Sequence, residues 1–429
     1  MHFNKILKNT IIWKLLNTAF IFFINLLMVR LLGVSESGIF FYDITILSFI
    51  ILVLSLSLES GITYYTVKEN VSTRSVLYIL IPFLLFQILL SWLIIKAIHL
   101  SISNSVAILF VFGNLCYTYF SALFYAKKRF ILINIISCGV NFLVIIFLSF
   151  GSLLIDNAYI NKYYYTFIYI LGIAFQVVLL ALIMVFKPNK SKVQPLILQP
   201  LATKIFTYSS VAFISNIVFF LVTRIDYFFV EKYCSTDSLS NYVQVSKFGQ
   251  IIVLVPSIIA SMVFPYSADK ADVFSLHNVQ QLCKTISFFF IPLTILVILT
   301  GGWILPFLFG KGFNLMYVAL LLYMPGFYAL SIISILAAYL AGKKHLIVNL
   351  IAGLLALIIV VIFDLLLIPI FGINAAAAVS SIAYIACGCY IIRFYKIKFN
   401  CNPGTFLSFK KQDVFNILTR IKNLKPIIK

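Results

Sequence analysis

The sequence consists mainly of long hydrophobic runs that are separated by short polar connections. A helix needs about 20 apolar residues to cross the hydrocarbon core of a bilayer. Twelve stretches of the chain reach about that length. The pattern therefore predicts an all-α polytopic membrane protein with about twelve transmembrane helices, at approximately residues 9–32, 39–66, 75–98, 104–126, 131–154, 164–186, 205–230, 239–265, 284–309, 315–341, 346–371 and 373–395.

The composition agrees with a membrane environment. Of the 429 residues, 63% are hydrophobic and 10% are charged, whereas a soluble globular domain is about 45–50% apolar and about 25% charged. No soluble fold could bury this much apolar surface. The seven cysteines and four histidines are scattered along the chain, without the spacing of a disulfide framework or a metal site. We therefore expect no metal and no cofactor.

The basic residues indicate the orientation of the chain in the membrane. The formal net charge is +20, which can indicate nucleic-acid binding. Here, however, the basic residues form short clusters between the apolar stretches, as the positive-inside rule requires. With a cytoplasmic N-terminus, 25 of the 32 Lys and Arg residues fall on the cytoplasmic side, five fall on the other side and two lie inside spans. This split predicts that both termini are cytoplasmic and that nucleic acid is not a partner.

The two halves of the chain resemble each other. The second span ends in Ser60–Thr66 and the eighth ends in Ser261–Ser267, while Lys127–Arg129 precedes the fifth span and Lys343–His345 precedes the eleventh. Six crossings return a chain to the side on which it started, so the halves would be parallel repeats, with a substrate site expected between them. The polar, proline-containing stretch 187–199 is the natural linker. We predict six-helix bundles at residues 1–195 and 200–398.

The last segment, residues 399–429, has a different pattern. Apolar residues recur there at helical spacing, while basic residues occupy the other faces. This spacing predicts a basic amphipathic helix on the cytoplasmic surface of the membrane. A disordered basic tail is the alternative.

Several short segments carry a resemblance to a known family. They are Val29–Gly33 at the end of the first span, Thr223–Asp226 in the seventh, and Leu367–Ala377 around the last two. In this order they resemble segments of the multidrug/oligosaccharidyl-lipid/polysaccharide (MOP) exporter superfamily, in particular its polysaccharide biosynthesis branch, which includes the O-antigen flippases. Two positions depart from the family's pattern, since Asn374 stands where the family often has Gly and Asp364 where it often has Asn.

The resemblance implies a fold and a function. The fold would be two parallel bundles around a central cavity that works by alternating access. The function would be to move a polyprenyl-diphosphate-linked oligosaccharide, such as an O-antigen, capsule or exopolysaccharide repeat unit, from the inner to the outer leaflet of the bacterial inner membrane. The implied partners are this lipid-linked oligosaccharide, membrane lipids, and possible contacts with a polysaccharide polymerase and glycosyltransferases.

Basic residues inside the spans suggest where an anionic substrate would bind. Arg224 and Lys247 each lie eight residues from the outer end of neighbouring spans, which places both roughly 12 Å inside the membrane surface. Two cations at one depth suit a diphosphate, because Arg offers a bidentate fork and Lys a mobile point charge. Arg30 and Lys14 in the first span are further candidates, although snorkelling and orientation charge also explain them.

Four carboxylates inside the spans are candidates for ion coupling. Charged groups at the centre of a span cost about 2.5–3.5 kcal/mol on insertion scales, so they usually face a cavity or one another. A coupling ion, H⁺ or Na⁺, is one role for them. Hydrogen bonding between helices is the alternative, and an ion pair between Asp226 and Lys247 is a specific form of it. The four candidates are Asp43, Glu59, Asp226 and Asp364.

Three other functions remain open at this point. A multidrug or cation antiporter of the same superfamily usually has acidic groups in its cavity, whereas Arg224 and Lys247 favour an anionic substrate. A membrane polysaccharide polymerase or ligase needs a sizeable outer loop with catalytic groups, and the predicted outer loops are short. A scaffold for synthesis enzymes would not need buried charges. We therefore expect a transporter without catalytic residues.

Overall fold

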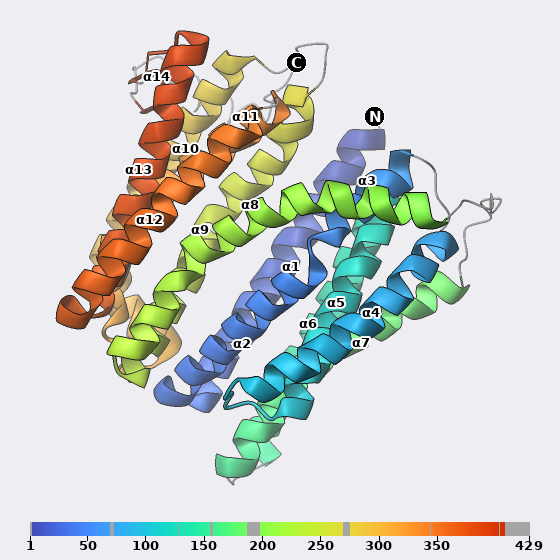
Figure 1. Cartoon of the computed structure of the whole chain (residues 1–429). Coiled ribbons are helices and arrows are strands. Elements are labelled where there is room, and N and C mark those ends of the chain that lie inside the picture. Colours follow the sequence, from blue (N-terminus) through green and yellow to red (C-terminus); the bar gives the residue numbers. More distant parts are fainter. Residues whose placement is uncertain are drawn as a thin grey trace. The chain divides into compact units, whose positions relative to one another are not determined.

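A computed structural model of the chain describes residues 2–68, 73–127, 129–154, 158–186, 198–268, 275–343, 345–402 and 404–407. Within these residues the chain forms helices connected by short turns (Figure 1). Twelve of the helices are long and apolar enough to cross a membrane, which confirms the predicted all-α polytopic membrane fold. The predicted linker lies largely outside the described residues, and so does the predicted amphipathic segment of the tail.

The helices divide between two compact units, residues 1–217 and 218–429. The division falls inside α8, rather than at the linker that the sequence suggests. The helices up to this point are α1 (His2–Leu32), α2 (Val34–Ser55), α3 (Leu58–Lys68), α4 (Thr73–Ala97), α5 (Asn104–Ala126), α6 (Phe130–Leu154), α7 (Ala158–Phe186) and α8 (Leu198–Tyr233). The helices after it are α9 (Thr236–Ala268), α10 (Leu276–Phe309), the 3₁₀ turn η1 (Lys311–Phe313), α11 (Met316–Gly342), α12 (Leu346–Phe371), α13 (Ile373–Phe399) and α14 (Gly404–Leu407).

The helices pair in the same order inside each unit. In the first unit α5 packs against α3, α4 and α7, and α6 packs against α7. In the second unit α11 packs against α9, α10 and α13, and α12 packs against α13. These four pairings of the first unit therefore have counterparts six crossings later, as expected for an internal repeat.

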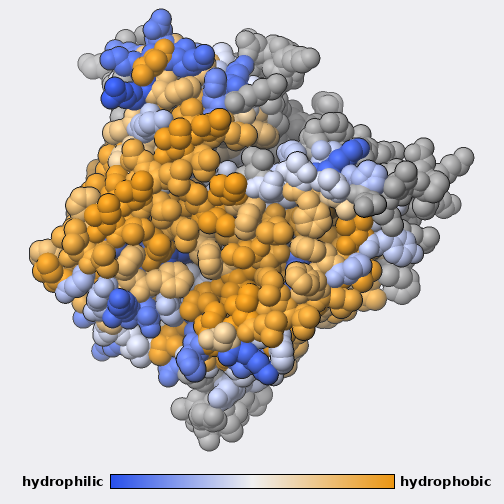
Figure 2. All heavy atoms as spheres, viewed as in Figure 1, coloured by the Kyte–Doolittle hydropathy of each residue, from blue (hydrophilic) through white to orange (hydrophobic). Residues whose placement is uncertain are grey.

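The outer faces of the helices are apolar. Leu299 and Trp303 on α10 are 77% and 71% exposed, and Ile347 and Ile370 on α12 are both 71% exposed. Figure 2 shows hydrophobic residues over most of the visible surface along the helices. Such apolar surface is unfavourable in water but favourable in contact with lipid tails. The exposed apolar residues therefore support the membrane assignment.

The turns between helices use glycine where the backbone requires it. Gly33 has φ 78° between α1 and α2, and Gly372 has φ 60° between α12 and α13. Residues with a Cβ rarely adopt this left-handed region. Both glycines belong to the segments that carry the family resemblance, so these segments include reversals of the chain.

One predicted span is not continuous. The stretch 39–66 was expected as a single helix, but α2 ends at Ser55 and α3 begins at Leu58 (Figure 1). Leu56 and Ser57 between them have φ 47° and 52°. The second transmembrane segment is therefore a broken helix, even though the break contains neither glycine nor proline.

Candidate functional site

The polar residues of the second unit lie on tightly packed helices. An added Cβ on Gly249 of α9 would lie 1.9 Å from the Phe327 ring of α11, and one on Gly326 of α11 would lie 2.7 Å from the Ser381 Cα of α13. Only helices that lack side chains at these positions can approach so closely. The close packing brings polar residues of α8, α9, α11 and α13 into contact across short distances.

Arg224 lies in a polar setting on α8. Its guanidinium donates to the Ser246 hydroxyl of α9 at 3.1 Å and to the Tyr227 hydroxyl one turn along α8. The Gln250 amide, with its oxygen turned toward the guanidinium, accepts a further hydrogen bond. The Tyr227 ring lies 4.9 Å from the guanidinium carbon, which is a cation–π distance. The guanidinium is thus fixed in place by neutral groups from two helices.

Lys247 is on α9, next to the residue that contacts Arg224. Its charge and that of Arg224 interact electrostatically, and both side chains are half-buried. The structure therefore brings together the two cations that the sequence nominated for an anion site. Two cations held near each other in a span repel unless an anion lies between them or close by.

Asp226 is completely buried and is held by neutral donors. One of its oxygens accepts from the Tyr242 hydroxyl of α9 and, at 3.3 Å, from the Ser380 hydroxyl of α13; the other accepts from the Tyr227 amide at 3.0 Å. In the described part of the chain, neutral hydroxyl and amide groups from α8, α9 and α13 thus hold the carboxylate.

A cluster of buried tyrosines surrounds Asp226. The Tyr242 and Tyr323 rings stack with centroids 6.2 Å apart, and the Tyr323 hydroxyl lies 3.3 Å from that of Tyr384. The Tyr384 hydroxyl donates to the Val222 carbonyl at 3.4 Å. This cluster, formed by Tyr227, Tyr242, Tyr323 and Tyr384, supplies hydroxyl groups in an otherwise apolar interior.

Asp364 on α12 is also fully buried, and it is the least satisfied carboxylate of this unit. Neither of its oxygens has a hydrogen-bond partner in the described part of the chain. Its charge interacts with those of Asp226 and Tyr242. A buried carboxylate without partners is too costly to keep ionised, so Asp364 must either carry a proton or bind a cation. Carboxylate and hydroxyl oxygens also suit a hard cation such as sodium.

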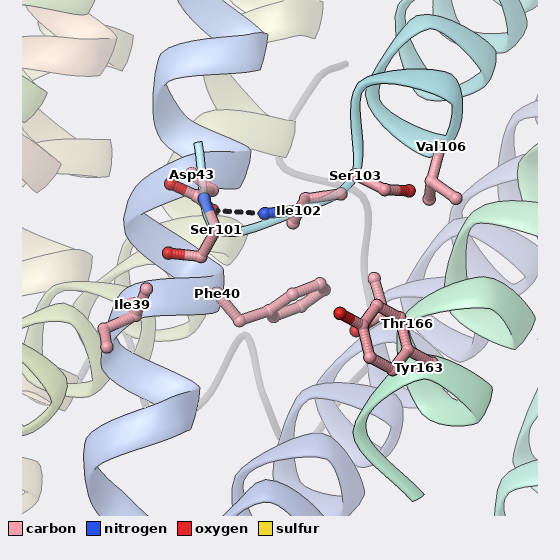
Figure 3. Close-up of a pocket in the computed structure, with 9 residues that line it drawn as sticks. All are labelled: Ile39, Phe40, Asp43, Ser101, Ile102, Ser103, Val106, Tyr163 and Thr166. Carbon is pink, nitrogen blue, oxygen red and sulfur yellow. Dashed lines mark hydrogen bonds between the residues drawn. The ribbon is translucent and has the colours of Figure 1, made fainter. Parts of the chain in front are cut away.

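Asp43 in the first unit has a different environment. One of its carboxylate oxygens accepts from the backbone amides of Ser101 at 2.8 Å and Ile102 at 3.1 Å (Figure 3). These residues belong to the turn between α4 and α5. A cavity of about 30 Å³ lies beside the carboxylate and is bordered by Tyr163 and Thr166 of α7. This volume is enough for one water molecule. Asp43 therefore anchors a turn, which corresponds to the hydrogen-bonding alternative.

The other candidates of the first unit are spread along its helices. Glu59 lies in the first turn of α3, directly after the helix break, and one of its oxygens is buried without a partner. Lys14 and Arg30 lie on α1 and are exposed. In the described residues no group of three or more His, Cys, Asp and Glu side chains is arranged to hold a metal.

Sequence reasoning missed several residues of these sites. Ser380, Tyr323 and Tyr384 surround Asp226, and Gln87 contacts the helix break. Serine and tyrosine are common in membrane helices as packing and interface residues, so their identity alone gives no signal. A buried glutamine in the middle of an apolar stretch is less common and could have been singled out.

Comparisons with known proteins place this arrangement in a family. Residues 27–318 match the model of a family described as polysaccharide biosynthesis protein. Among proteins with curated functions, none matches the sequence.

Solved structures share the fold. Lipid II flippase MurJ in an inward closed conformation matches with a TM-score of 0.72 and 16% identity, covering 97% of this chain and 93% of that one. The Vibrio cholerae MATE transporter VcmN matches at 0.67 and 12%, covering 94% and 99%, and the eukaryotic MATE transporter AtDTX14 at 0.64 and 12%, covering 97% and 98%. The chain thus belongs to the family described as polysaccharide biosynthesis protein, and it shares its fold with these transporters.

Proposed function

We propose that this protein is a flippase that moves a polyprenyl-diphosphate-linked oligosaccharide from the inner to the outer leaflet of a bacterial cytoplasmic membrane by alternating access. The observation that carries the proposal is the hydrogen bond from Arg224 on α8 to Ser246 on α9, the residue directly before Lys247. A diphosphate that enters a membrane protein must exchange its hydration shell for fixed donors and positive charge. Family membership supplies the context, since polysaccharide repeat units are assembled on lipid carriers before export.

The residues around Arg224 position it for this task. Ser246, Gln250 and the Tyr227 ring hold the guanidinium in one place, so little side-chain entropy is lost when an anion binds. Lys247 contributes a second charge on a flexible stem. Lys14 and Arg30 on α1 add positive charge in the other unit. A charge-assisted contact contributes about 1.5–3 kcal/mol, so losing one should slow transport by about ten- to a hundredfold.

We further propose that Asp226 and Asp364 couple this movement to a monovalent cation gradient. Among the described residues, Asp364 has no donor for either oxygen, whereas Asp226 has three. A proton or sodium ion at Asp364 would remove the repulsion between the two carboxylates. Cation binding would then favour one arrangement of α8, α12 and α13, and release would favour the other. Asp43 and Glu59 remain candidates in the first unit.

Reconstituted protein tests the anion site directly. Proteoliposomes would be loaded with a fluorescent short-chain polyprenyl diphosphate that carries a sugar, and its appearance in the outer leaflet would be followed with a membrane-impermeant quencher. Arg224→Ala and Lys247→Ala should each slow the exchange by about ten- to a hundredfold. Lys232→Ala is the matched control, because it removes an exposed cation at the end of the same helix. Wild-type rates in both site variants would overturn the anion site.

A multidrug or cation antiporter is the second candidate. It is favoured by one observation, the pair of buried carboxylates Asp226 and Asp364, which could receive a cationic substrate. An antiporter would extrude cationic dyes from cells and confer drug resistance, but it would not restore surface polysaccharide in a host that lacks its own flippase. A polymerase or ligase would instead form product from purified lipid-linked substrate. These readouts separate the three functions.

A further inference from the structure

The break in the second transmembrane segment has no cause within the segment itself. Leu56 and Ser57 both adopt left-handed backbone angles between α2 and α3, a region that residues with a Cβ rarely occupy. A break inside an apolar span also frees backbone groups that lipid cannot satisfy. Such strain persists only when the surroundings enforce it, and it is concentrated at functional sites. The strained break therefore points to a function for its surroundings.

Polar side chains from three other helices enclose the break. Gln87 of α4 is 1% exposed, and its amide nitrogen donates to the Leu54 carbonyl at the end of α2 (2.5 Å) and to the Tyr119 hydroxyl of α5 (2.7 Å). Asn216 of α8 donates to the Ser57 hydroxyl at 3.0 Å. All these residues lie in the first unit. The break is thus stabilised by side chains that are remote in sequence.

Two oxygen atoms of this cluster remain without a donor. The side-chain oxygen of Gln87 and one carboxylate oxygen of Glu59 are inaccessible to solvent and have no hydrogen-bond partner among the described residues. The Glu59 charge interacts with Tyr119, which also accepts from Gln87. Gln87 and Glu59 therefore both interact with Tyr119, the first by a hydrogen bond and the second electrostatically. A buried carboxylate, an amide oxygen and a hydroxyl form an acceptor-rich site that lacks only a positive charge.

Among the described residues, the groups that interact with Glu59 and Tyr119 include no positively charged side chain. Tyr119 and Cys116 are the titratable groups of α5 that interact there. The α4 helix contributes the neutral Gln87. The α8 helix contributes two further neutral residues, Asn216 and Ser209, and the Ser209 hydroxyl lies close to Gly61 of α3. The cluster is separate from the carboxylates of the second unit, because it lies entirely within the first.

We propose that the broken helix forms a binding site for one monovalent cation, held by Glu59, the Gln87 oxygen and the Tyr119 hydroxyl. The cation is a proton on the Glu59 carboxylate or a sodium ion between the oxygens, since either supplies the missing positive charge. Discontinuous transmembrane helices place such sites beside exposed helix ends. Binding stabilises the broken conformation, and release allows the segment to change. The protein then has a second cation site, in addition to the carboxylates Asp226 and Asp364.

The test measures cation binding to the purified full-length chain and needs no transport. An Asp364→Asn background removes the proposed site of the second unit, so that any remaining binding reports on the first. Two assays identify the bound cation. Binding of radioactive sodium at alkaline pH detects a sodium site, and proton uptake in an unbuffered solution with a pH dye detects a protonated carboxylate. Glu59→Gln and Gln87→Leu are compared in this background. Glu231→Gln is the control, because it changes an exposed carboxylate outside the cluster.

The expected result is one bound cation in the Asp364→Asn protein and in the Glu231→Gln control, with affinity at least about tenfold weaker after Glu59→Gln, which is about 1.4 kcal/mol. If sodium binding shows the loss, the ligand is sodium; if only proton uptake shows it, the ligand is a proton. Gln87→Leu should weaken sodium binding even if Glu59→Gln does not fold. Binding that is unchanged in both cluster variants would overturn the proposal. It would leave the proposed flippase function untouched, since that rests on Arg224 and Lys247.

Discussion

The role of Asp43 can be decided by two substitutions that differ in charge and shape. Its carboxylate accepts the backbone amides of Ser101 and Ile102, and so fixes the turn that leads into α5 (Figure 3). Asp43→Ala removes both hydrogen bonds. Asp43→Asn removes the charge but keeps an oxygen that can accept both amides. Anchoring and ion coupling predict different results for the second variant.

The magnitude follows from the two hydrogen bonds. A hydrogen bond to a charged group contributes about 1.5–3 kcal/mol. Ser101 is exposed, so its amide can turn to water, whereas Ile102 is buried and its amide cannot. We therefore expect Asp43→Ala to lower the free energy of unfolding by about 2–4 kcal/mol. Neutral hydrogen bonds are about half as strong as charged ones, so Asp43→Asn should cost about 1–2 kcal/mol.

The assay combines unfolding with a local probe. Denaturant unfolding of the purified protein in one detergent gives the free energies. A cysteine introduced by Ser103→Cys, at the start of α5, reports the order of the turn by its rate of labelling. Labelling should accelerate strongly in the Asp43→Ala background and only slightly with Asn. The anchoring argument is refuted if Asn is as destabilising as Ala. It is also refuted if Asp43→Asn is stable yet fails to transport, because the carboxylate would then have to titrate.

Other outcomes can be tested in parallel. Arg224→Lys should slow transport by about tenfold, because lysine cannot make the planar fork of the guanidinium; initial rates in proteoliposomes measure it. Gly326→Ala should lower the free energy of unfolding by about 1–3 kcal/mol, because its Cβ would lie 2.7 Å from a backbone atom of α13. Gly302→Ala is its control, with the nearest atom at 3.8 Å. Externally added thiol reagents should label Ile160→Cys and spare Lys128→Cys; the opposite pattern would invert the predicted topology.

The sequence was sufficient for the helices but not for the interruption between α2 and α3. Apolar length is a local property, so counting hydrophobic residues found twelve spans that the structure confirms. The break at Leu56 and Ser57 is not local, because neither residue favours it. It depends on Gln87 and Asn216, which are remote in sequence. A pattern within one segment cannot report contacts that only the folded unit creates.

The candidate sites were predictable to a similar extent. Equal depth in adjacent spans was enough to place Arg224 and Lys247 together, because neighbouring antiparallel helices bring equal depths side by side. The hydrogen-bond partners of Asp226 were not predictable, since Ser380 lies 154 positions away and reaches the carboxylate through the packing of α13. From the sequence, an ion pair with Lys247 was one alternative for this carboxylate. The hydroxyl groups of Tyr242 and Ser380 that bind it gave no signal in the sequence.

The four carboxylates that the sequence nominated for ion coupling fall into two classes, and this division leads to a final prediction. Asp43 and Asp226 accept hydrogen bonds from the protein, whereas Asp364 and Glu59 have buried oxygens without donors among the described residues. An unsatisfied buried acceptor costs about 1–3 kcal/mol, and more when it is charged, so an amide side chain removes the charged part of that cost. Amide substitution should therefore lower the free energy of unfolding at Asp43 and Asp226, and raise it or leave it unchanged at Asp364 and Glu59.

The effect of these amide substitutions on transport should follow the opposite order. The unsatisfied acids are costly to keep, and this cost is expected where a residue binds a ligand that the folded protein alone does not supply. Asp364→Asn and Glu59→Gln should thus give stable proteins with impaired gradient-driven transport, while Asp43→Asn should give a less stable protein that still transports. Unfolding free energies and transport rates for the four amide variants test this directly. If the free energy of unfolding falls for both Asp43→Asn and Asp364→Asn, then hydrogen bonding to the protein does not separate structural acids from ligand-binding ones.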